Sequence, residues 1–387
     1  MVLSERDGAE MSDMKIARYL TKVIGPRVSG SPKEAEVAEF ISSEFQKLNL
    51  ETEIQKFRYL GWRQEARPSL SVLSPFQKTL RISPVAYSGS TPLEGVEGVL
   101  KFYGTFYLFP RLMELPKFAL IDDQGETAAF VLVLRGNRSA AIPNPWLQIL
   151  QDPMVLVSEE EFMSVRKAME SGEEVRVHLK SVAEYVKCFT SYNVIARIEG
   201  KSRDTIIIGG HHDSMEDSPG AIDNASGVEG IFRLAEKLLQ KKRNYSFNLI
   251  TWGGHEWGLF GSQYFVKDGK ERGYLDQIKA CLTLDVLGCG DFLWIWAGPS
   301  TFREKIESTL KKSGLMKRRE MRFEDTLIGS DDWSFSGEKI PHAMFMDWPV
   351  DTLHLPTDVY EEIDEKKLDS GVEVAFSMVE HFEKYGV

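Results

Sequence analysis

Along its central part the chain alternates short apolar runs with clusters of polar residues. An apolar run at 206–208 ends at two glycines, and a polar loop follows as far as residue 223. From 228 to 239, apolar residues recur three and four positions apart, which is the spacing of an amphipathic helix, and 226–229 is a capping-box pattern that opens it. The pattern predicts a buried parallel strand, a loop and a helix. In open α/β sheets, binding sites lie beyond the carboxyl ends of such strands.

The same rhythm continues toward both ends of the chain. Near the N-terminus it predicts helices at 14–24 and 31–48 and a strand at 51–57. In the second half we expect strands at 193–198, 247–252, 281–286, 292–297 and 343–346, and helices after Gly258, at 302–312 and from about Asp364. These elements predict an α/β fold with a mixed, mostly parallel central sheet flanked by helices.

Residues 59–185 follow a different pattern, in which short β-rich pieces are separated by Pro and Gly and one helix is expected at 159–170. Because the α/β rhythm returns afterwards, we interpret this stretch as an inserted, smaller β-rich domain. The α/β domain would then consist of residues 1–58 plus 186–387. The aromatic residues at 102–109 are expected in the core of the insertion or at the domain interface, and a wall facing the substrate is the alternative.

Residues of the types that bind metals stand at successive predicted strand ends. They are His211, Asp213 and Asp223 around the first loop, His255 and Glu256 after 247–252, Asp285 at the end of 281–286, and His354 after the last buried run. Taken singly, an Asp after a strand is usually a turn or cap residue. Their recurrence at one strand end after another indicates a metal site, and a set of two His and three carboxylates among them suits zinc.

Composition narrows the classes of function. The net charge is −11 and no block of Lys or Arg occurs, which argues against nucleic acid as a partner. The three cysteines lack the spacing of a disulfide framework. The N-terminus has no apolar signal-like stretch, and no run reaches the length of a membrane span. We therefore expect a cytoplasmic protein without membrane contact, of undetermined oligomeric state.

Six segments together resemble the co-catalytic dizinc peptidases related to bacterial leucyl aminopeptidases and glutamate carboxypeptidase. They are GGHHDS (209–214), GAIDNASG (220–227), GGHEWGLFGS (253–262), LTLDVLG (282–288), GSDDWSF (329–335) and LHLPTDVYEEID (353–364). Their order and spacing agree with that family throughout the α/β part of the chain. The insertion resembles, more loosely, a protease-associated domain.

The resemblance implies two divalent cations, zinc in this family, and no organic cofactor. The terminal ligands would be His211, Glu256, Asp285 and His354. Asp223 would bridge the two ions, and a cis peptide is expected between Asp223 and Asn224. Asp213 would accept a hydrogen bond from the far nitrogen of His211 and so fix its tautomer.

The implied function is that of a metal-dependent exopeptidase, specifically an aminopeptidase, because two dications lower the pKa of a shared water and polarise a peptide carbonyl. One position departs from the family, since His255 stands where a glutamate normally acts as general base. An imidazole with a pKa of about 6.5 can accept a proton, although neighbouring dications lower that pKa. Two alternatives stay open: a single-zinc transferase of the glutaminyl cyclase type, and a catalytically decayed binding protein of the same fold.

Overall fold

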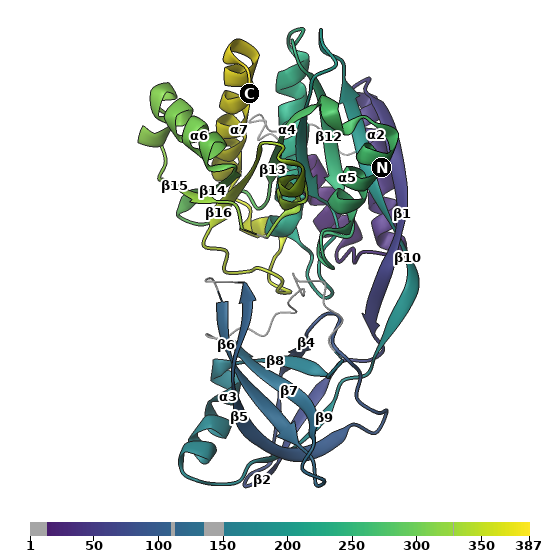
Figure 1. The fold of residues 1–387 in the computed structure, drawn as a ribbon, viewed down its shortest axis with the longest axis vertical. Helices are drawn as coiled ribbons and strands as arrows, with labels where there is room; N and C mark the ends of the chain where they lie inside the picture. The colour runs from purple at the N-terminus through teal and green to yellow at the C-terminus, as the bar shows by residue number, and fades with distance from the viewer. Residues whose placement is uncertain (1–13, 110–112, 135–150, 328) are drawn as a thin grey trace, which may run out of the picture.

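The computed structural model describes residues 14–109, 113–134, 151–327 and 329–387. They form two lobes, each built on an eight-stranded sheet (Figure 1). Most helices belong to the larger lobe, which also contains the C-terminus, and the smaller lobe is β-rich. The expected mixed α/β class is confirmed.

The sheet of the larger lobe is mixed. In spatial order its strands are β1 (Glu51–Gln64), β10 (Ala183–Ile198), β12 (Ser246–Trp252), β11 (Thr205–His211), β13 (Ile278–Leu284), β16 (His342–Trp348), β14 (Phe292–Gly298) and β15 (Met321–Asp325). The neighbours β12, β11, β13 and β16 run parallel, whereas the β1–β10, β10–β12 and β16–β14 pairs are antiparallel. The parallel group brings the carboxyl ends of four strands to one edge of the sheet.

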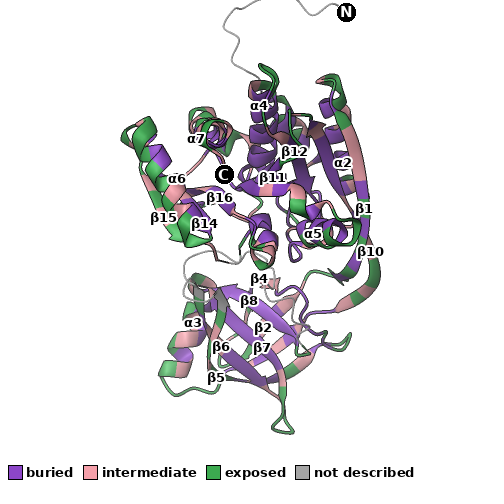
Figure 2. Cartoon of the chain, turned by 45° about the horizontal axis from the view of Figure 1, so that its top comes forward, coloured by how far each residue is buried: buried purple, intermediate pink, exposed green. Residues whose placement is uncertain are grey.

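Helices cover both faces of this sheet, as the alternation along β11 shows. Ile206 and Ile208 pack into the largest core, whereas Ile207 packs into a second core on the opposite face. The first face carries α1 (Lys15–Arg18), α2 (Pro32–Lys47), α4 (Ser226–Leu239), α6 (Ser300–Ser313) and α7 (Glu365–Tyr385), and the second carries α5 (Phe260–Arg272). Burial on both faces explains the uninterrupted apolar run of β11, and Figure 2 shows the buried strands between the helices.

The capping box predicted at 226–229 is wrong. The Ser226 hydroxyl donates to a carbonyl of the preceding turn and accepts a hydrogen bond from the Leu287 N–H. Glu229 instead accepts a hydrogen bond from the N–H of Ile16, at the start of α1. Both side chains therefore have partners distant in the sequence, which the local pattern does not reveal.

The β-rich lobe holds the second sheet and one long helix. In spatial order its strands are β3 (Lys78–Leu80), β2 (Ser69–Ser74), β9 (Arg176–Lys180), β5 (Val96–Phe109), β6 (Met113–Ile121), β7 (Thr127–Leu134), β8 (Met154–Ser158) and β4 (Ile82–Pro84). The helix predicted at 159–170 is confirmed as α3 (Glu159–Glu170), which packs Phe162 and Val165 into the core of this lobe.

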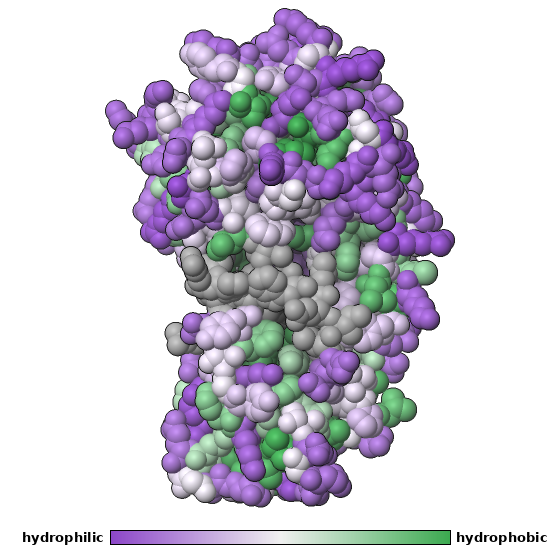
Figure 3. Space-filling view, in the orientation of Figure 1, coloured by the Kyte–Doolittle hydropathy of each residue, from purple (hydrophilic) through white to green (hydrophobic). Residues whose placement is uncertain are grey.

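The expectation of a buried aromatic cluster on β5 is wrong for three of its members. Phe102, Tyr103 and Tyr107 are 64%, 62% and 56% exposed. Beyond Gly104, β5 pairs only with a part of β6 that has no second partner strand, so Tyr107 lies in a two-stranded ribbon, whereas Phe102 lies where β6 also pairs with β7. In the view of Figure 3, hydrophobic side chains gather more on the β-rich lobe than on the larger lobe.

The strands β1 and β10 form a long antiparallel ribbon that joins the two lobes (Figure 1). Their pairing extends from Glu51 with Arg197 to Gln64 with Ala183. The predicted domain boundaries, at 58–59 and 185–186, fall inside these two strands, and the division into domains stays a prediction. Among the described residues, no helix has the length and apolar character needed to cross a membrane.

Candidate metal centre

The parallel strands deliver all five predicted ligands to one edge of the larger sheet. They are His211 at the end of β11, Asp223 in the turn before α4, Glu256 in the turn after β12, Asp285 directly after β13, and His354 after β16. The peptide between Asp223 and Asn224 is cis, which confirms that expectation. The close approach of α4 to β13 requires a glycine at 227, because a Cβ there would lie 2.3 Å from the Leu284 carbonyl oxygen.

The two carboxylate oxygens of Asp223 face different histidines. Oδ1 lies 2.9 Å from His211 Nε2, and Oδ2 lies 3.1 Å from His354 Nε2. Asp285 Oδ1 lies 3.4 Å from His211 Nε2, and Glu256 Oε2 lies 3.3 Å from His354 Nε2. The cluster therefore divides into two sets of three residues that share Asp223.

The chemistry of this cluster fits divalent cations. The ligand atoms of His211, Asp223 and Glu256 all lie within 4.8 Å of one another, and so do those of His211, His255 and Asp285. His211 Nε2 and Glu256 Oε1 are buried and make no contact with the geometry of a hydrogen bond to any described residue. Buried polar atoms are rarely left in this way, and three adjacent carboxylates repel one another unless cations lie between them. The residues present can hold two ions, with one shared carboxylate.

Opposite charges control protonation within the cluster. Burial raises the pKa of Asp223, but His211 and His354 outweigh burial and hold that pKa well below its ordinary value. Burial lowers the pKa of His211, but Asp285 and the neighbouring carboxylates raise it well above its ordinary value. Protons on these imidazoles compete with cations for the same nitrogens, so metal binding releases protons.

Asp213 contacts His211 with both its backbone carbonyl and its carboxylate. His211 Nδ1 donates to the Asp213 carbonyl at 3.1 Å, while Asp213 Oδ1 lies 3.6 Å away and helps to raise the pKa of His211. The carboxylate also accepts the backbone N–H groups of His255 at 3.3 Å and of Glu256 at 3.1 Å. The carbonyl is the closer acceptor for Nδ1, and the side chain anchors the turn that carries Glu256.

His255 stacks on His211, with ring centroids 3.7 Å apart and planes inclined by 6°. Its Nδ1 donates to Asp331 Oδ2 at 2.8 Å, and its Nε2 lies 3.9 Å from Asp285 Oδ2. A metal–imidazole bond lies near the ring plane, so two parallel stacked rings do not both point at one ion. Burial and His211 lower the pKa of His255, but Asp331 and Asp285 outweigh them and raise it to about 9.

Arg27 supports the site and has no signal in the local sequence. Its guanidinium is fully buried and donates to the carbonyls of His212, Pro219 and Gly220. Burial lowers the pKa of Arg27 to about 10, with Asp358 opposing the shift, so the side chain stays cationic at neutral pH. It thereby fixes both ends of the loop between His211 and Asp223.

Two further side chains, those of Ser330 and Asp358, hold the ligands in place. Ser330 Oγ donates to Asp285 Oδ2 at 2.5 Å. Asp358 accepts the backbone N–H groups of Ile222 at 2.7 Å and of Asp223 at 3.1 Å. Both lie in segments that carry the resemblance, but the sequence alone did not assign them these contacts.

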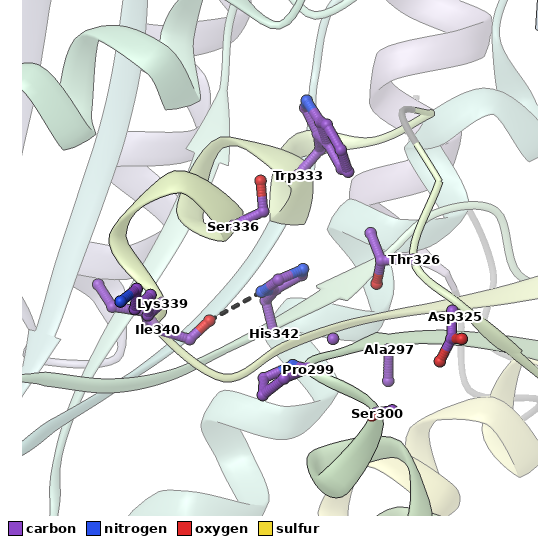
Figure 4. A pocket seen from close by; sticks show the side chains of 11 residues that line it. Ala297, Pro299, Ser300, Asp325, Thr326, Trp333, Ser336, Lys339, Ile340 and His342 are labelled. Atoms are coloured by element: carbon purple, nitrogen blue, oxygen red, sulfur yellow. Dashed lines mark hydrogen bonds between the residues drawn. The ribbon is translucent and has the colours of Figure 1, made fainter.

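A cavity of about 500 Å³ is lined by residues at the amino end of β16 and contains none of the predicted ligands (Figure 4). His342 lines it, and its Nδ1 donates to the Ile340 carbonyl at 2.7 Å. The turn η5 (Asp331–Glu338) separates the cavity from the cluster, because Asp331 contacts His255 whereas Trp333 faces the cavity. We assign no part of the chemistry to this cavity.

The fold is that of known peptidases. A Peptidase M28 precursor from Shewanella amazonensis SB2B superposes with a TM-score of 0.76 at 20% identity, covering 97% of this chain and 93% of that one. An aminopeptidase from Aneurinibacillus sp. strain AM-1 gives 0.71 at 23% identity, covering 96% and 94%. BSAP, a zinc aminopeptidase from Bacillus subtilis, gives 0.72 at 20% identity, covering 96% and 94%. These likenesses establish the fold of the chain.

Sequence comparison finds a matching family model and similar proteins. Residues 193–379 match the model of Peptidase family M28. Aminopeptidase YwaD of Bacillus subtilis (strain 168) is 25% identical over an alignment of 319 residues that covers 74% of this chain and 67% of YwaD. Leucine aminopeptidase 2 of Trichophyton equinum is 31% identical over 142 residues, 36% of this chain and 28% of that protein. The chain thus matches less than a third of that relative's length.

Proposed function

We propose that the protein is a two-metal aminopeptidase that releases residues from the N-termini of peptides. The observation that carries the proposal is the division of the cluster into two sets that share Asp223, with His211 on one oxygen and His354 on the other. YwaD and leucine aminopeptidase 2 are aminopeptidases by name, and BSAP is a zinc aminopeptidase. These names support zinc and an aminopeptidase activity over the transferase alternative.

Different residues would bind the two ions and transfer the proton. One ion would be held by His211, Asp285 and Asp223, and the other by His354, Glu256 and Asp223. Bound there, the cations would lower the pKa of a shared water and polarise the peptide carbonyl. His255 Nε2, which is not needed as a ligand, would accept the proton that this water loses and return it to the leaving amine. Asp213 would keep the turn that carries His255 in place.

Metal analysis of the purified protein together with a panel of aminoacyl arylamides tests this function. We expect two zinc ions per chain, hydrolysis that a chelator removes and added zinc restores, and no cleavage of the N-acetylated arylamide, which lacks the free amine. One ion per chain, with cyclisation of an N-terminal glutamine, would instead identify the transferase. Two ions without any hydrolysis would identify a decayed enzyme.

We further propose that the β-rich lobe acts as a protease-associated-like domain that limits access to the site. An aromatic cluster, composed of residues of β1, of the segment after β4 and of the site loops, supports this role. In it, Trp62 of β1 lies against Trp257, which follows the ligand Glu256, with ring centroids 5.9 Å apart. Tyr87 belongs to the same cluster and donates its hydroxyl proton to the Leu60 carbonyl.

Tyr87→Ala loosens this contact and is expected to change the ratio of kcat/KM for a dipeptide to that for a ten-residue peptide. The reason is that the lobe would no longer be held at a fixed distance from the site. Leu73→Ala, at an exposed position of β2, is the matched control and should leave the ratio unchanged. Equal ratios in the wild type and in Tyr87→Ala would show that the lobe does not control access.

A further inference from the structure

Asp331 lies where the unusual His255 needs a partner. The Asp331 carboxylate is fully buried, and its Oδ2 accepts the hydrogen bond from His255 Nδ1 at 2.8 Å. Its Oδ1 accepts the Ser262 hydroxyl at 2.6 Å, and this hydroxyl lies 2.9 Å from that of Ser334. Each oxygen thus has its own donor, so the carboxylate cannot rotate without losing a buried hydrogen bond.

This contact determines which nitrogen of His255 can act as a base. An ionised carboxylate only accepts hydrogen bonds, so Nδ1 must carry a proton. The lone pair of the neutral ring is therefore on Nε2, which points to the side of Asp285. The stack on His211 fixes the plane of the ring as well. Tautomer and orientation are both set before any substrate binds.

We propose that Asp331 is the positioning residue of His255, and that the two side chains together replace the glutamate that serves as base elsewhere in the family. This inference rests on the proposed function. The hydrogen bond from Nδ1 to Asp331 and the stack on His211 together hold the ring in one orientation, so Nε2 keeps one direction.

Every proton that moves during peptide hydrolysis is accounted for. The attacking water transfers one proton to Nε2 as its oxygen bonds to the peptide carbon, and the Nδ1 proton stays on the ring. The Asp331 carboxylate keeps its hydrogen bond to Nδ1 throughout, as the acidic member of a Ser-His-Asp triad does. The Nε2 proton then passes to the leaving nitrogen as the C–N bond breaks, which restores the neutral ring.

Asp331→Asn is expected to lower kcat roughly 10²–10⁴-fold, because the amide would donate to Nδ1 and move the ring proton to Nε2. We expect KM to change less than about threefold and the zinc content to stay the same, since Asp331 is not a predicted ligand. The matched control is Glu338→Gln in the same turn, whose carboxylate pairs with Lys270. It should behave like the wild type.

Testing Asp331→Asn in a second variant, His255→Glu, distinguishes the positioning of His255 from a purely structural role of Asp331. In His255→Glu there is no imidazole to orient, so adding Asp331→Asn should cost less than about threefold in kcat. If Asp331→Asn lowers kcat equally in both backgrounds, the residue acts through something other than His255. Wild-type kcat in the single Asp331→Asn variant would also overturn the proposal, while leaving the peptidase assignment intact.

The tautomer of His255 can be determined by NMR, without any catalytic turnover. In zinc-loaded protein labelled with ¹⁵N-histidine, we expect a strongly downfield proton correlated with Nδ1 of His255, identified by its absence in His255→Ala. Asp331→Asn should remove this resonance. A wild-type His255 protonated only on Nε2, or a resonance that survives Asp331→Asn, would refute the dyad even if the enzyme proved to have a different substrate.

Discussion

Asp223→Ala is expected to remove both metal ions and to lower hydrolysis by more than the 10²–10⁴-fold that loss of a proton acceptor typically costs. The reason is geometric, since one oxygen of Asp223 faces His211 and the other faces His354. Elemental analysis and zinc titration calorimetry should show weaker binding at both positions. Replacing Asp285 or Glu256 should weaken chiefly one.

Stability measurements give this prediction an independent readout. Zinc that binds only the native state raises the melting temperature by mass action. Asp223→Ala should lose this zinc-dependent increase, measured against the melting temperature of the metal-free variant, which itself falls because His211 and His354 lose their shared carboxylate. Asp217→Ala, at an exposed position of the same loop, is the control and should keep the increase. Two ions bound with wild-type affinity in Asp223→Ala would disprove the bridging role.

His255→Ala is expected to lose most of kcat, roughly 10²–10⁴-fold, while both metal ions stay bound. The ring lies parallel to His211 rather than converging with it on one ion, so its removal takes away a proton acceptor and not a ligand. His255→Glu restores the residue usual in the family and should retain or raise kcat. Steady-state kinetics beside metal analysis of each variant would measure both effects, with His381→Ala, near the C-terminus, as control.

The competing hypothesis of a decayed enzyme makes the opposite prediction. It expects negligible hydrolysis in the wild type and a gain only in His255→Glu. An active wild type whose rate is indifferent to His255→Ala would contradict both accounts, because some other group would then transfer the proton.

Elements with a strong local pattern could be predicted from the sequence. The helix at 159–170 combines a Ser158 cap, acidic residues in its first turn and an apolar stripe, and it occurs with the predicted bounds. Ser31 likewise caps α2, with the Glu34 N–H donating to its hydroxyl. By contrast, β15 (Met321–Asp325) is an edge strand with little burial, so its sequence lacks the apolar run that marked its neighbours.

The sequence could predict the site residues that follow predicted strands, but not the residues that support them. The five ligands follow strands that the apolar runs reveal, whereas their supports come from distant segments. Arg27 contacts a carbonyl 185 residues away, His255 and Asp331 are 76 apart, and Asp358 holds a turn 136 positions earlier. No periodicity links such positions, and each support is a charged residue that would ordinarily be interpreted as solvent-exposed.

The ribbon of β1 and β10 has a consequence for the order of folding. Its strands pair Glu51 with Arg197 and Gln64 with Ala183, so the whole β-rich lobe forms the loop between them. Closing a long flexible loop costs conformational entropy, and contacts between distant segments form slowly. A lobe that first folds around its own core holds its two ends near each other and reduces that cost. Because β10 pairs with β12, whose end leads into the Glu256 turn, we expect the metal-binding edge to assemble last.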